Sequence, residues 1–328
     1  MNKNRKKLRI GVCGVGSIGF RHARLLSQRN DVDLCLSDTT RDHLKAAGLL
    51  PNVSGSTESF DELLGSGLDG LIIATPDQFH VPQAEAACRK KIAVLIEKPI
   101  AETASQGERL RHCATGAHIL VGYPLRYNSI FLKGKEILDA GSIGRPVSFH
   151  VMLGAYNTLL AAKNRFDAAD RNKLFVDYSH EWDYINWFLG KVRRVAAVAH
   201  QSGDLERTQD PNVIDGVLEL ESGLSGTAHL DYVQAPGNRA FTVIGDKGTM
   251  VIDAVKGLVS VQIYQEDFDR VYRVVESFDL MLQRQHDHFI EVIRGTAEPK
   301  VTVADGVNAL RVADAMLAAC ENGTWVEV

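Results

Sequence analysis

Three glycines at fixed spacing follow an apolar run near the start of the chain. Residues 8–13 read LRIGVC, and Gly-x-Gly-x-x-Gly follows at once, ahead of a helical pattern over Ile18–Gln28. In such a context the first glycine permits a tight turn, the second lets the backbone approach a pyrophosphate, and the third lets the helix pack closely against the strand. Backbone N–H groups at the helix start then face the anion. The pattern therefore predicts a dinucleotide-binding loop rather than an ordinary glycine-rich turn, made of Gly14, Gly16, Ser17, Ile18 and Gly19.

An acidic residue stands where such a loop needs one. Asp38 follows the predicted strand Val32–Ser37 and lies 19 positions beyond Gly19 (38 − 19). A carboxylate at this place accepts hydrogen bonds from ribose hydroxyls and repels a 2′-phosphate. The sequence therefore favours NAD as the cofactor, while the nearby Arg41 leaves NADP open.

The first 125 residues alternate strand-like and helical segments. Strands that alternate with helices form βαβ units, and nearly continuous apolar runs are typical of strands covered on both faces. This half therefore predicts a Rossmann domain, an α/β fold with a doubly wound parallel sheet, over residues 1–125. The expected strands are Leu8–Cys13, Val32–Ser37, Gly70–Ala74, Ala93–Ile96 and His118–Gly122, and the expected helices are Ile18–Gln28, Arg41–Ala47, Asp61–Leu64, Val81–Arg89 and Ser105–Cys113.

Residues 126–328 have a different pattern, in which strands follow one another with few helices between them. Turn signals such as Gly245-Asp246-Lys247-Gly248 separate the strands, which is typical of a mostly antiparallel sheet. We expect a C-terminal α+β domain with a large open sheet for substrate binding and oligomerisation. Its expected strands are Val147–Leu153, Val192–His200, Val213–Leu220, Ser225–Tyr232, Ala240–Ile244, Thr249–Asp253, Leu258–Tyr264 and Arg270–Val275, with helices at Ser129–Asp139, Tyr178–Leu189, Leu280–Arg294 and Ala304–Glu321.

Composition argues against several classes of function. The chain has 328 residues and a net charge of −4, so no basic excess indicates binding to nucleic acid or to an anionic membrane. No apolar stretch is long enough to span a bilayer, and the basic N-terminal residues precede no signal-peptide core. Five cysteines without a CxxC spacing predict reduced thiols and a cytoplasmic protein.

Several stretches resemble the Gfo/Idh/MocA family of sugar and inositol dehydrogenases. They are IIATPDQFH (72–80), VLIEKPIA (94–101), GYPLRYN (122–128), VDYSHEWDYINWFLG (176–190), FTVIGDKGTM (241–250) and RQHDHFIEVIRG (284–295). The resemblance runs nearly end to end, and Glu97-Lys98-Pro99 is its most specific mark. It implies an NAD- or NADP-dependent oxidoreductase that moves a hydride between nicotinamide and a secondary alcohol or ketone of a sugar, inositol or derivative. It also implies cofactor contacts at Thr75, Pro76, His80, Glu97 and Lys98, although a histidine at the start of a helix can equally cap or pack.

Lys98 fits a base for alcohol oxidation on chemical grounds as well. Removing a hydride from a CH–OH group also requires removal of the hydroxyl proton, and a lysine can take it when burial and a nearby positive ring lower its pKa. Pro99 restricts Lys98 to extended backbone, which directs its side chain off the end of the strand. The alternative is an ordinary surface lysine.

His180 is the candidate acid or base in the second half. Asp183 follows it by three positions, so the two share one face of the predicted helix, and by resemblance His180 contacts the reacting hydroxyl while Asp183 contacts substrate. The usual family pattern has an acid four residues before this histidine, where this chain has Val176. Asp177 either orients the base from three residues away or caps the helix start, and the sequence leaves both open.

Further substrate contacts are expected from Tyr123 and Arg126, which follow the last strand of the first domain, and from Tyr156. Arg126 could instead form an ion pair between domains. The irregular stretch 154–173 is long enough to suggest a substrate wall. His286-x-His288 has no supporting ligands in sequence, so no metal site is expected.

The many strands and few helices of the second half leave one sheet face to be covered. We therefore expect a homodimer or homotetramer through this sheet, as the resemblance also implies. Two other functions stay open at the level of sequence: a dinucleotide-binding regulator without turnover, and a reductase of a non-sugar substrate such as a dihydrodiol or bile pigment. The substrate itself is expected to be a small sugar or polyol.

Overall fold

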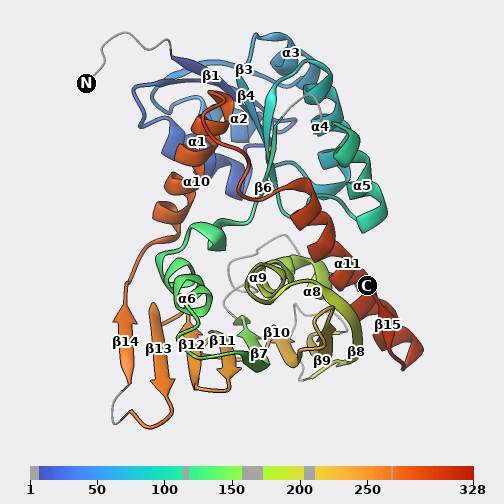
Figure 1. The fold of residues 1–328 in the computed structure, drawn as a ribbon. Coiled ribbons are helices and arrows are strands. Elements are labelled where there is room, and N and C mark those ends of the chain that lie inside the picture. The colour runs from blue at the N-terminus through green and yellow to red at the C-terminus, as the bar shows by residue number, and fades with distance from the viewer. Residues whose placement is uncertain (1–6, 114–117, 157–172, 203–210, 267–268) are drawn as a thin grey trace. The chain divides into compact units, whose positions relative to one another are not determined.

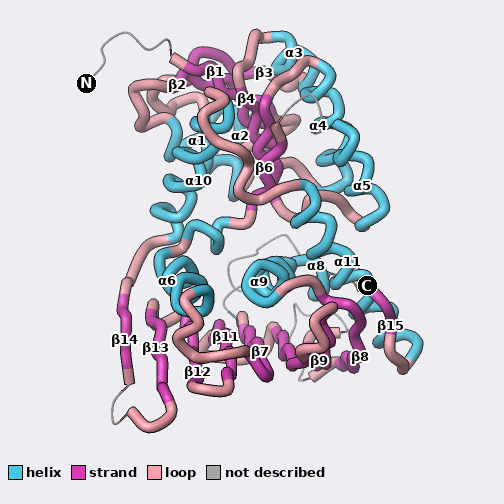
Figure 2. Tube along the Cα trace, in the orientation of Figure 1, coloured by secondary structure: helices cyan, strands magenta, loops and turns pink. Residues whose placement is uncertain are grey.

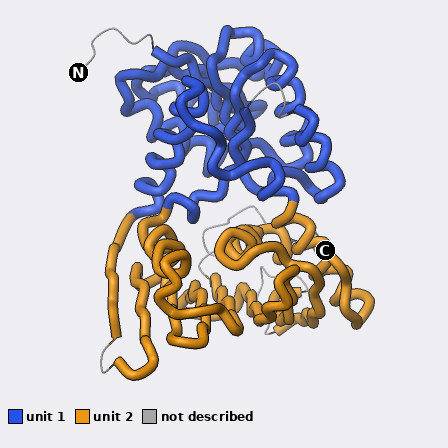
Figure 3. The backbone as a smooth tube through the Cα atoms, viewed as in Figure 1, with its two compact units in different colours: residues 1–127, 277–307 blue, residues 128–276, 308–328 orange. Residues whose placement is uncertain are grey.

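A computed structural model describes residues 7–113, 118–156, 173–202, 211–266 and 269–328. The chain forms two compact units, shown in Figure 3. Unit 1 contains Met1–Tyr127 and Ser277–Val307, and unit 2 contains Asn128–Glu276 and Asn308–Val328. The expected division after residue 125 into cofactor and substrate domains stays a prediction about roles. A late segment of the chain, Ser277–Val307, packs with the first 127 residues and so belongs to unit 1.

Unit 1 is built on a parallel sheet, sheet A (Figure 1). Its six described strands run in the order β3-β2-β1-β4-β5-β6, which is the order typical of dinucleotide-binding folds. All five neighbouring pairs are parallel, which confirms the predicted doubly wound sheet. The strands are β1 (Leu8–Cys13), β2 (Val32–Ser37), β3 (Val53–Thr57), β4 (Gly70–Ile73), β5 (Ala93–Glu97) and β6 (Ile119–Gly122).

Helices cover both faces of sheet A, with α1 and α10 on one side and α4 and α5 on the other (Figures 1 and 2). The buried residues of α1 are Gly19, His22, Ala23, Leu25 and Leu26, so its inner face is apolar apart from one histidine. The helices of unit 1 are α1 (Ser17–Leu26), α2 (Arg41–Ala47), α3 (Phe60–Gly65), α4 (His80–Arg89), α5 (Ala104–Cys113), α10 (Phe278–Ile293) and the first residues of α11 (Val303–Asn322), with short 3-10 turns η1 (Asp77–Phe79) and η2 (Pro124–Tyr127).

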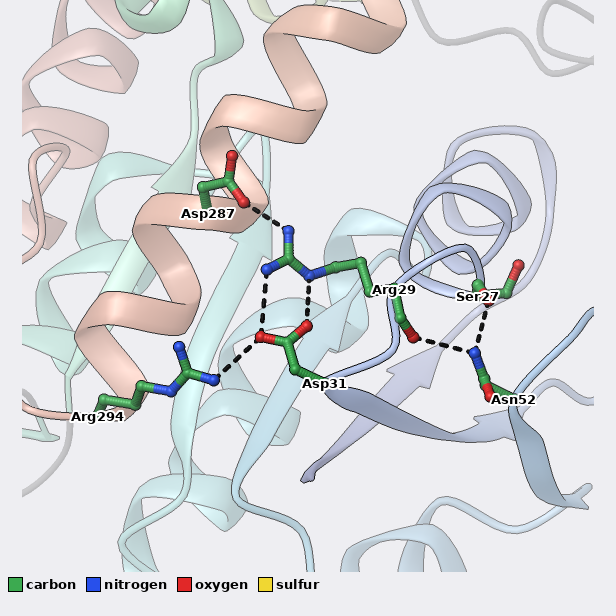
Figure 4. A network of polar contacts seen from close by, with 6 residues as sticks. All are labelled: Ser27, Arg29, Asp31, Asn52, Asp287 and Arg294. Atoms are coloured by element: carbon green, nitrogen blue, oxygen red, sulfur yellow. Dashed lines mark hydrogen bonds and ion pairs between the residues drawn. The ribbon is translucent and has the colours of Figure 1, made fainter. Parts of the chain in front are cut away.

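Helix α10 belongs to the returning segment and is fixed to the turn between α1 and β2 by charged groups (Figure 4). Arg29 donates to Asp287 of α10 at 2.5 Å and to Asp31 at 3.0 Å, and Arg294 donates to Asp31 at 3.0 Å. Partial burial acts to raise the pKa of Asp31, but the two guanidinium groups outweigh it and lower that pKa. Asn52 ties the same turn to β3 by donating to the carbonyls of Ser27 and Arg29.

Unit 2 is built on sheet B, whose nine described strands run β14-β13-β12-β11-β7-β10-β9-β8-β15. Every neighbouring pair is antiparallel except β7 and β10, which confirms a mostly antiparallel sheet. The strands are β7 (Pro146–Gly154), β8 (Val192–His200), β9 (Val213–Leu220), β10 (Ser225–Asp231), β11 (Asn238–Gly245), β12 (Gly248–Asp253), β13 (Leu258–Ile263), β14 (Arg270–Arg273) and β15 (Val326–Glu327).

One face of sheet B is packed against helices α6 (Ser129–Asp139), α9 (Ser179–Leu189) and the later part of α11. Phe188 of α9 meets Phe241 of β11 at 5.2 Å between ring centroids. A Cβ on Gly134 of α6 would lie 2.4 Å from Ile252, so glycine is what allows this helix its close approach to the sheet. Aromatic and aliphatic packing on this face forms the core of unit 2.

The opposite face of sheet B carries a mixed set of side chains. Cross-strand partners point to the same face, and the register aligns Val217, Thr227 and His150 in one row and Asp215, His229 and Met152 in the next. In unit 2 Val217 is 42% exposed and Met152 41% exposed, and Val198 beside Asp215 is 65% exposed.

Candidate functional site

The glycine loop after β1 is shaped by contacts within unit 1. Gly14 has φ +80°, and a Cβ there would lie 2.6 Å from the carbonyl oxygen of Ala74. A Cβ on Gly19 would lie 1.7 Å from the carbonyl oxygen of Gly14, so α1 can approach the loop only with glycine at that position. At Gly16 the nearest described atom is Cε1 of His43, 4.0 Å away. The backbone at Gly16 is therefore free of close side chains, which is compatible with the approach that a pyrophosphate requires.

The start of α1 is suited to an anion. Ser17 is the first residue of α1, and Gly16, as its N-cap residue, provides no side-chain hydrogen bond to the first amides. The first turn also has no acidic residue. The amides of Ser17, Ile18 and Gly19 are those that a phosphate would engage. These residues fit the diphosphate of a dinucleotide.

Asp38 is held against the glycine loop. Its Oδ2 accepts a hydrogen bond from the amide of Val15 at 2.7 Å, and its Oδ1 accepts one from Thr40 at 2.8 Å. Burial acts to raise the pKa of Asp38, but these two amides and the ring of His43 outweigh it and lower that pKa. Asp38 is therefore an ionised acceptor at neutral pH, as recognition of a ribose diol requires.

The carboxyl ends of β1, β4 and β5 lie side by side. The register places Cys13 opposite Ile73 and Ile73 opposite Ile96, so three loops begin at one edge of sheet A. With a strand spacing of about 4.8 Å, the loop after β5 begins about 10 Å from the glycine loop. Ligands of open α/β sheets bind at this edge.

His80 joins two of these loops. Its ring is 1% exposed, with Nδ1 2.7 Å from the carbonyl oxygen of Pro99 and Nε2 2.8 Å from that of Thr75. The hydroxyl of Thr75 donates to Gln83 at 2.7 Å, and Pro76 is exposed. His80 therefore links the loop after β4 to the loop after β5 through backbone carbonyls. Its predicted contact with cofactor stays a prediction.

Glu97 ends β5 and is 8% exposed. Its Oε1 lies 2.8 Å from Nε2 of His22 on α1, and its Oε2 accepts the amide of Lys98 at 3.2 Å. Nδ1 of His22 lies 2.7 Å from Nε2 of His286 on α10. His22 was not predicted as a site residue. The sequence feature that could have indicated it is a polar residue on the otherwise apolar face of α1.

Lys98 follows Glu97 at the same sheet edge and is half-buried, and its peptide bond to Pro99 is cis. This placement beside the candidate cofactor loop is what the resemblance leads us to expect for a lysine that acts on substrate. A primary amine at such a site can hold or accept a proton from a hydroxyl group.

In unit 2, His180 lies in the first turn of α9, and Asp183 lies one turn later with 1% exposure. The structure corrects one of the two interpretations of Asp177. The N-cap of α9 is Tyr178, and Asp177 is the last residue of the short helix α8 (Lys173–Asp177). The carboxylate of Asp177 accepts a hydrogen bond from the hydroxyl of Tyr232, the residue that follows β10, at 3.2 Å.

The neighbours of His180 on α9 are held firmly in unit 2. Glu181 is 0% exposed and lies 2.9 Å from Nε of Arg239 on β11. Tyr184 packs between Phe131 and Phe241, and burial, with a contribution from the Glu181 carboxylate, raises its pKa well above the usual value. The buried side of α9 thus fixes the helix that carries His180.

The other predicted substrate contacts are distributed over both units. Tyr123 is 0% exposed, and Arg126 is 5% exposed and pairs with Asp305 of α11 at 3.1 Å within unit 1. Tyr156 is half-buried. Their roles toward substrate stay predictions, and residues 157–172 of the expected substrate wall lie outside the described residues.

Metal ligation has no structural support in the part of the chain that the structure describes. No group of three or more His, Cys, Asp and Glu side chains there could hold a metal ion. His286 is bonded to His22, whereas His288 accepts the amide of Lys300 at 3.0 Å, so the two do not share a site. None of the described helices is long and apolar enough to cross a membrane.

Comparison with known proteins agrees with this geometry. The chain is 29% identical to inositol 2-dehydrogenase 1 of Saccharopolyspora erythraea, over 98% of this chain and 96% of the relative. It is 25% identical to scyllo-inositol 2-dehydrogenase (NAD(+)) of Bacillus subtilis, over 98% and 96%. The fold matches scyllo-inositol dehydrogenase from Lactobacillus casei, solved with NAD(H) and scyllo-inositol, with a TM-score of 0.84 at 22% identity over 98% and 99% of the two chains.

Two sequence families cover nearly all of the chain. Residues 8–123 match the oxidoreductase family with the NAD-binding Rossmann fold, and residues 135–328 match the C-terminal alpha/beta domain of the same family. The first match covers sheet A with its glycine loop and Glu97-Lys98-Pro99, and the second covers sheet B with α9. The resemblance noted in the sequence is confirmed, and the chain belongs to the Gfo/Idh/MocA oxidoreductase family.

Proposed function

We propose that this protein is an NAD-dependent dehydrogenase that oxidises a secondary alcohol of a cyclic polyol or sugar to the ketone. The observation that carries the proposal is the position of Lys98, on the loop that begins two strands from the glycine loop at the same carboxyl edge of sheet A. The relatives named inositol 2-dehydrogenases, which match over nearly the whole chain, support a polyol as the substrate class.

The reaction divides between a hydride and a proton. Bound NAD supplies the acceptor for the hydride that leaves the carbon. The proton leaves the hydroxyl oxygen, and we assign its removal to Lys98, with His180 as the second proposed acid–base group. Asp183 is proposed to contact the substrate, and Asp177 is proposed to orient His180. Tyr123, Arg126 and Tyr156 are proposed to contact the remaining hydroxyls.

The ionised Asp38 supports NAD over NADP. Oδ2 accepts the amide of Val15 and lies 3.3 Å from Nδ1 of His43, whereas Oδ1 accepts the amide of Thr40 and keeps a second lone pair for a ribose hydroxyl. A 2′-phosphate would meet this negative charge at close range.

A screen of NAD reduction, followed by absorbance of NADH, tests the proposal. Substrates should include myo-inositol, scyllo-inositol, aldoses and sugar nucleotides, each with NAD and with NADP. We expect turnover with at least one cyclic polyol or sugar and preference for NAD. Binding of NAD without turnover on any of these compounds would favour a regulator instead.

The open face of sheet B supports a homodimer or homotetramer. Val217, Met152 and Val198 are exposed apolar side chains among polar neighbours on this face. A second copy of the chain would cover them. Light scattering should give at least twice the 36.0 kDa of one chain. Val217→Glu should lower this mass, whereas Leu49→Glu, at an 86% exposed residue of unit 1, should not. A monomeric wild-type protein at micromolar concentration would contradict this arrangement.

We also place the protein in the cytoplasm. The five cysteines are free thiols in the described structure, three of them buried, and this fits a reducing compartment.

A further inference from the structure

Three buried polar side chains form one row inside unit 1. His286 Nε2, His22 Nδ1, His22 Nε2 and Glu97 Oε1 are joined by contacts of 2.7 and 2.8 Å. His22 is 0% exposed, His286 1% and Glu97 8%. The three residues come from α1, β5 and α10, and His286 lies 264 positions from His22. The returning segment of the chain therefore contributes the far end of a row that ends at the Glu97-Lys98-Pro99 turn.

The direction of the two hydrogen bonds to Glu97 follows from the donor count. The carboxylate of Glu97 only accepts, so Nε2 of His22 must donate to Oε1, and the amide of Lys98 donates to Oε2. Burial, with the nearby His22 and Arg29, holds the pKa of His286 well below its usual value, so this ring is neutral. Nδ1 of His22 and Nε2 of His286 share one hydrogen bond, and the tautomers of the two rings decide which of them donates. The four atoms that join the three side chains are all hydrogen-bonded, which lowers the cost of burying them.

The row fixes the backbone on one side of Lys98, and His80 fixes it on the other. Glu97 holds the amide of Lys98, while Nδ1 of His80 lies 2.7 Å from the carbonyl oxygen of Pro99. Lys98 is thus placed between two residues that histidines hold in position. A reacting group must be held within a fraction of an ångström of its productive position, and the residues that contact it determine whether it is held there.

We propose that His286 and His22 are positioning residues for Lys98, and that they act through the carboxylate of Glu97. This inference rests on the proposed function of Lys98, and it predicts a role in catalysis for helix α10, which follows strands β7 to β14 in the sequence. Neighbouring Gln285 is equally buried on α10, but its side-chain nitrogen and oxygen have no hydrogen-bond partner among the described residues. Gln285 is therefore a matched control for a polar residue outside the row.

The test compares His286→Leu with Gln285→Leu in the full-length enzyme. His286→Leu leaves Nδ1 of His22 without its hydrogen-bond partner, and His286→Gln restores a side-chain amide that can donate or accept. We expect His286→Leu to lower kcat about 10- to 100-fold while the Kd for NAD stays within about threefold. His286→Gln should recover most of the rate, and Gln285→Leu should stay within about twofold of wild type.

A second readout needs no substrate. Hydrogen exchange at the amide of Lys98, followed by mass spectrometry, should be slow in the wild type and in Gln285→Leu, and at least about tenfold faster in His286→Leu. If the wild type oxidises no polyol, the proposed function fails while this measurement still decides the positioning role. If His286→Leu does not fold, the smaller His286→Ala, which also lacks a hydrogen-bonding side chain, replaces it with the same expectations. The inference would be overturned if the His286 variants kept the kcat and the Lys98 amide exchange rate of the wild type. It would also be overturned if the Lys98 amide of the wild type exchanged without protection.

Discussion

Asp38 Oδ2 accepts a hydrogen bond from the amide of Val15 at 2.7 Å. This bond fixes the carboxylate that follows β2 against the glycine loop that follows β1. Replacing Asp38 by Ala should therefore change cofactor choice more than fold. We expect the KM for NAD to rise about 10- to 100-fold, because hydrogen bonds to a charged group contribute about 1.5–3 kcal/mol. The KM for NADP should fall, because the negative charge is gone. Steady-state rates with both cofactors check this. Asp42→Ala, at an exposed position in α2, should leave both constants unchanged.

Gly16 and Gly19 should respond differently to alanine. A Cβ on Gly19 meets a backbone oxygen at 1.7 Å, so Gly19→Ala should lower the free energy of unfolding by about 1–3 kcal/mol or more. At Gly16 the nearest described atom is 4.0 Å away, so Gly16→Ala should change stability by less than about 1 kcal/mol. It should nevertheless weaken NAD binding by at least about tenfold, because its methyl group enters the space of the pyrophosphate. Denaturant unfolding and calorimetry separate the two effects, and equal losses of stability would contradict this account.

Lys98→Ala should abolish turnover without abolishing cofactor binding. We expect kcat to fall about 10²- to 10⁴-fold, as is typical when a group that transfers a proton is removed. The Kd for NAD should stay within about a few-fold, because the glycine loop and Asp38 are untouched. Stopped-flow measurement of NADH formation and fluorescence titration with NAD supply the two numbers. Lys90→Ala, at an exposed lysine just after α4, is the control and should keep the wild-type rate. Near-native turnover by Lys98→Ala would remove Lys98 from the mechanism.

His229 should make the stability of unit 2 depend on pH. Its ring lies 2.7 Å from Asp215 and 3.1 Å from Asp231. Burial acts to lower the pKa of His229, but the two carboxylates outweigh it and raise that pKa. A raised folded-state pKa stabilises the fold below the unfolded value of about 6.5, and the contribution is lost as pH rises through the folded-state pKa.

The difference in Tm between wild type and His229→Gln should therefore be largest near about pH 6 and should disappear in the alkaline range. Thermal unfolding from mildly acid to alkaline pH measures it. His150 on the same face of sheet B is bonded to the neutral hydroxyl of Thr227 at 2.8 Å, so His150→Gln should show no such trend. A pH-independent difference for His229→Gln would mean that the carboxylates do not raise its pKa.

Strong periodic patterns predicted most of the fold. The ranges of β1, β2, α2, α6, β8 and β9 agree with expectation to the residue, because each combines an apolar pattern with clear turn signals at its ends. Strand β3 was missed because Val53–Thr57 reads VSGST and is half-exposed along its length at the edge of sheet A. A strand without an apolar run carries little periodic signal.

The candidate site could be predicted only where a motif is local. The glycine loop, Asp38 and Lys98 stand in short patterns whose spacing has a chemical reason. The link from His286 through His22 to Glu97 could not be predicted, because it depends on how a late helix packs against α1. Asp177 shows the same limit, since its partner Tyr232 lies 55 positions away on another element.

The return of α10 to unit 1 has a consequence for the order in which the chain can fold during synthesis. Gly70 of β4 lies against Ile293 and Phe289, so the sheet face beside β4 stays open to water until those residues have left the ribosome. Domains generally fold as units, from the N-terminus onward, as they emerge. In this protein the nucleotide-binding half begins first and is completed only after strands β7 to β14 of sheet B have been translated.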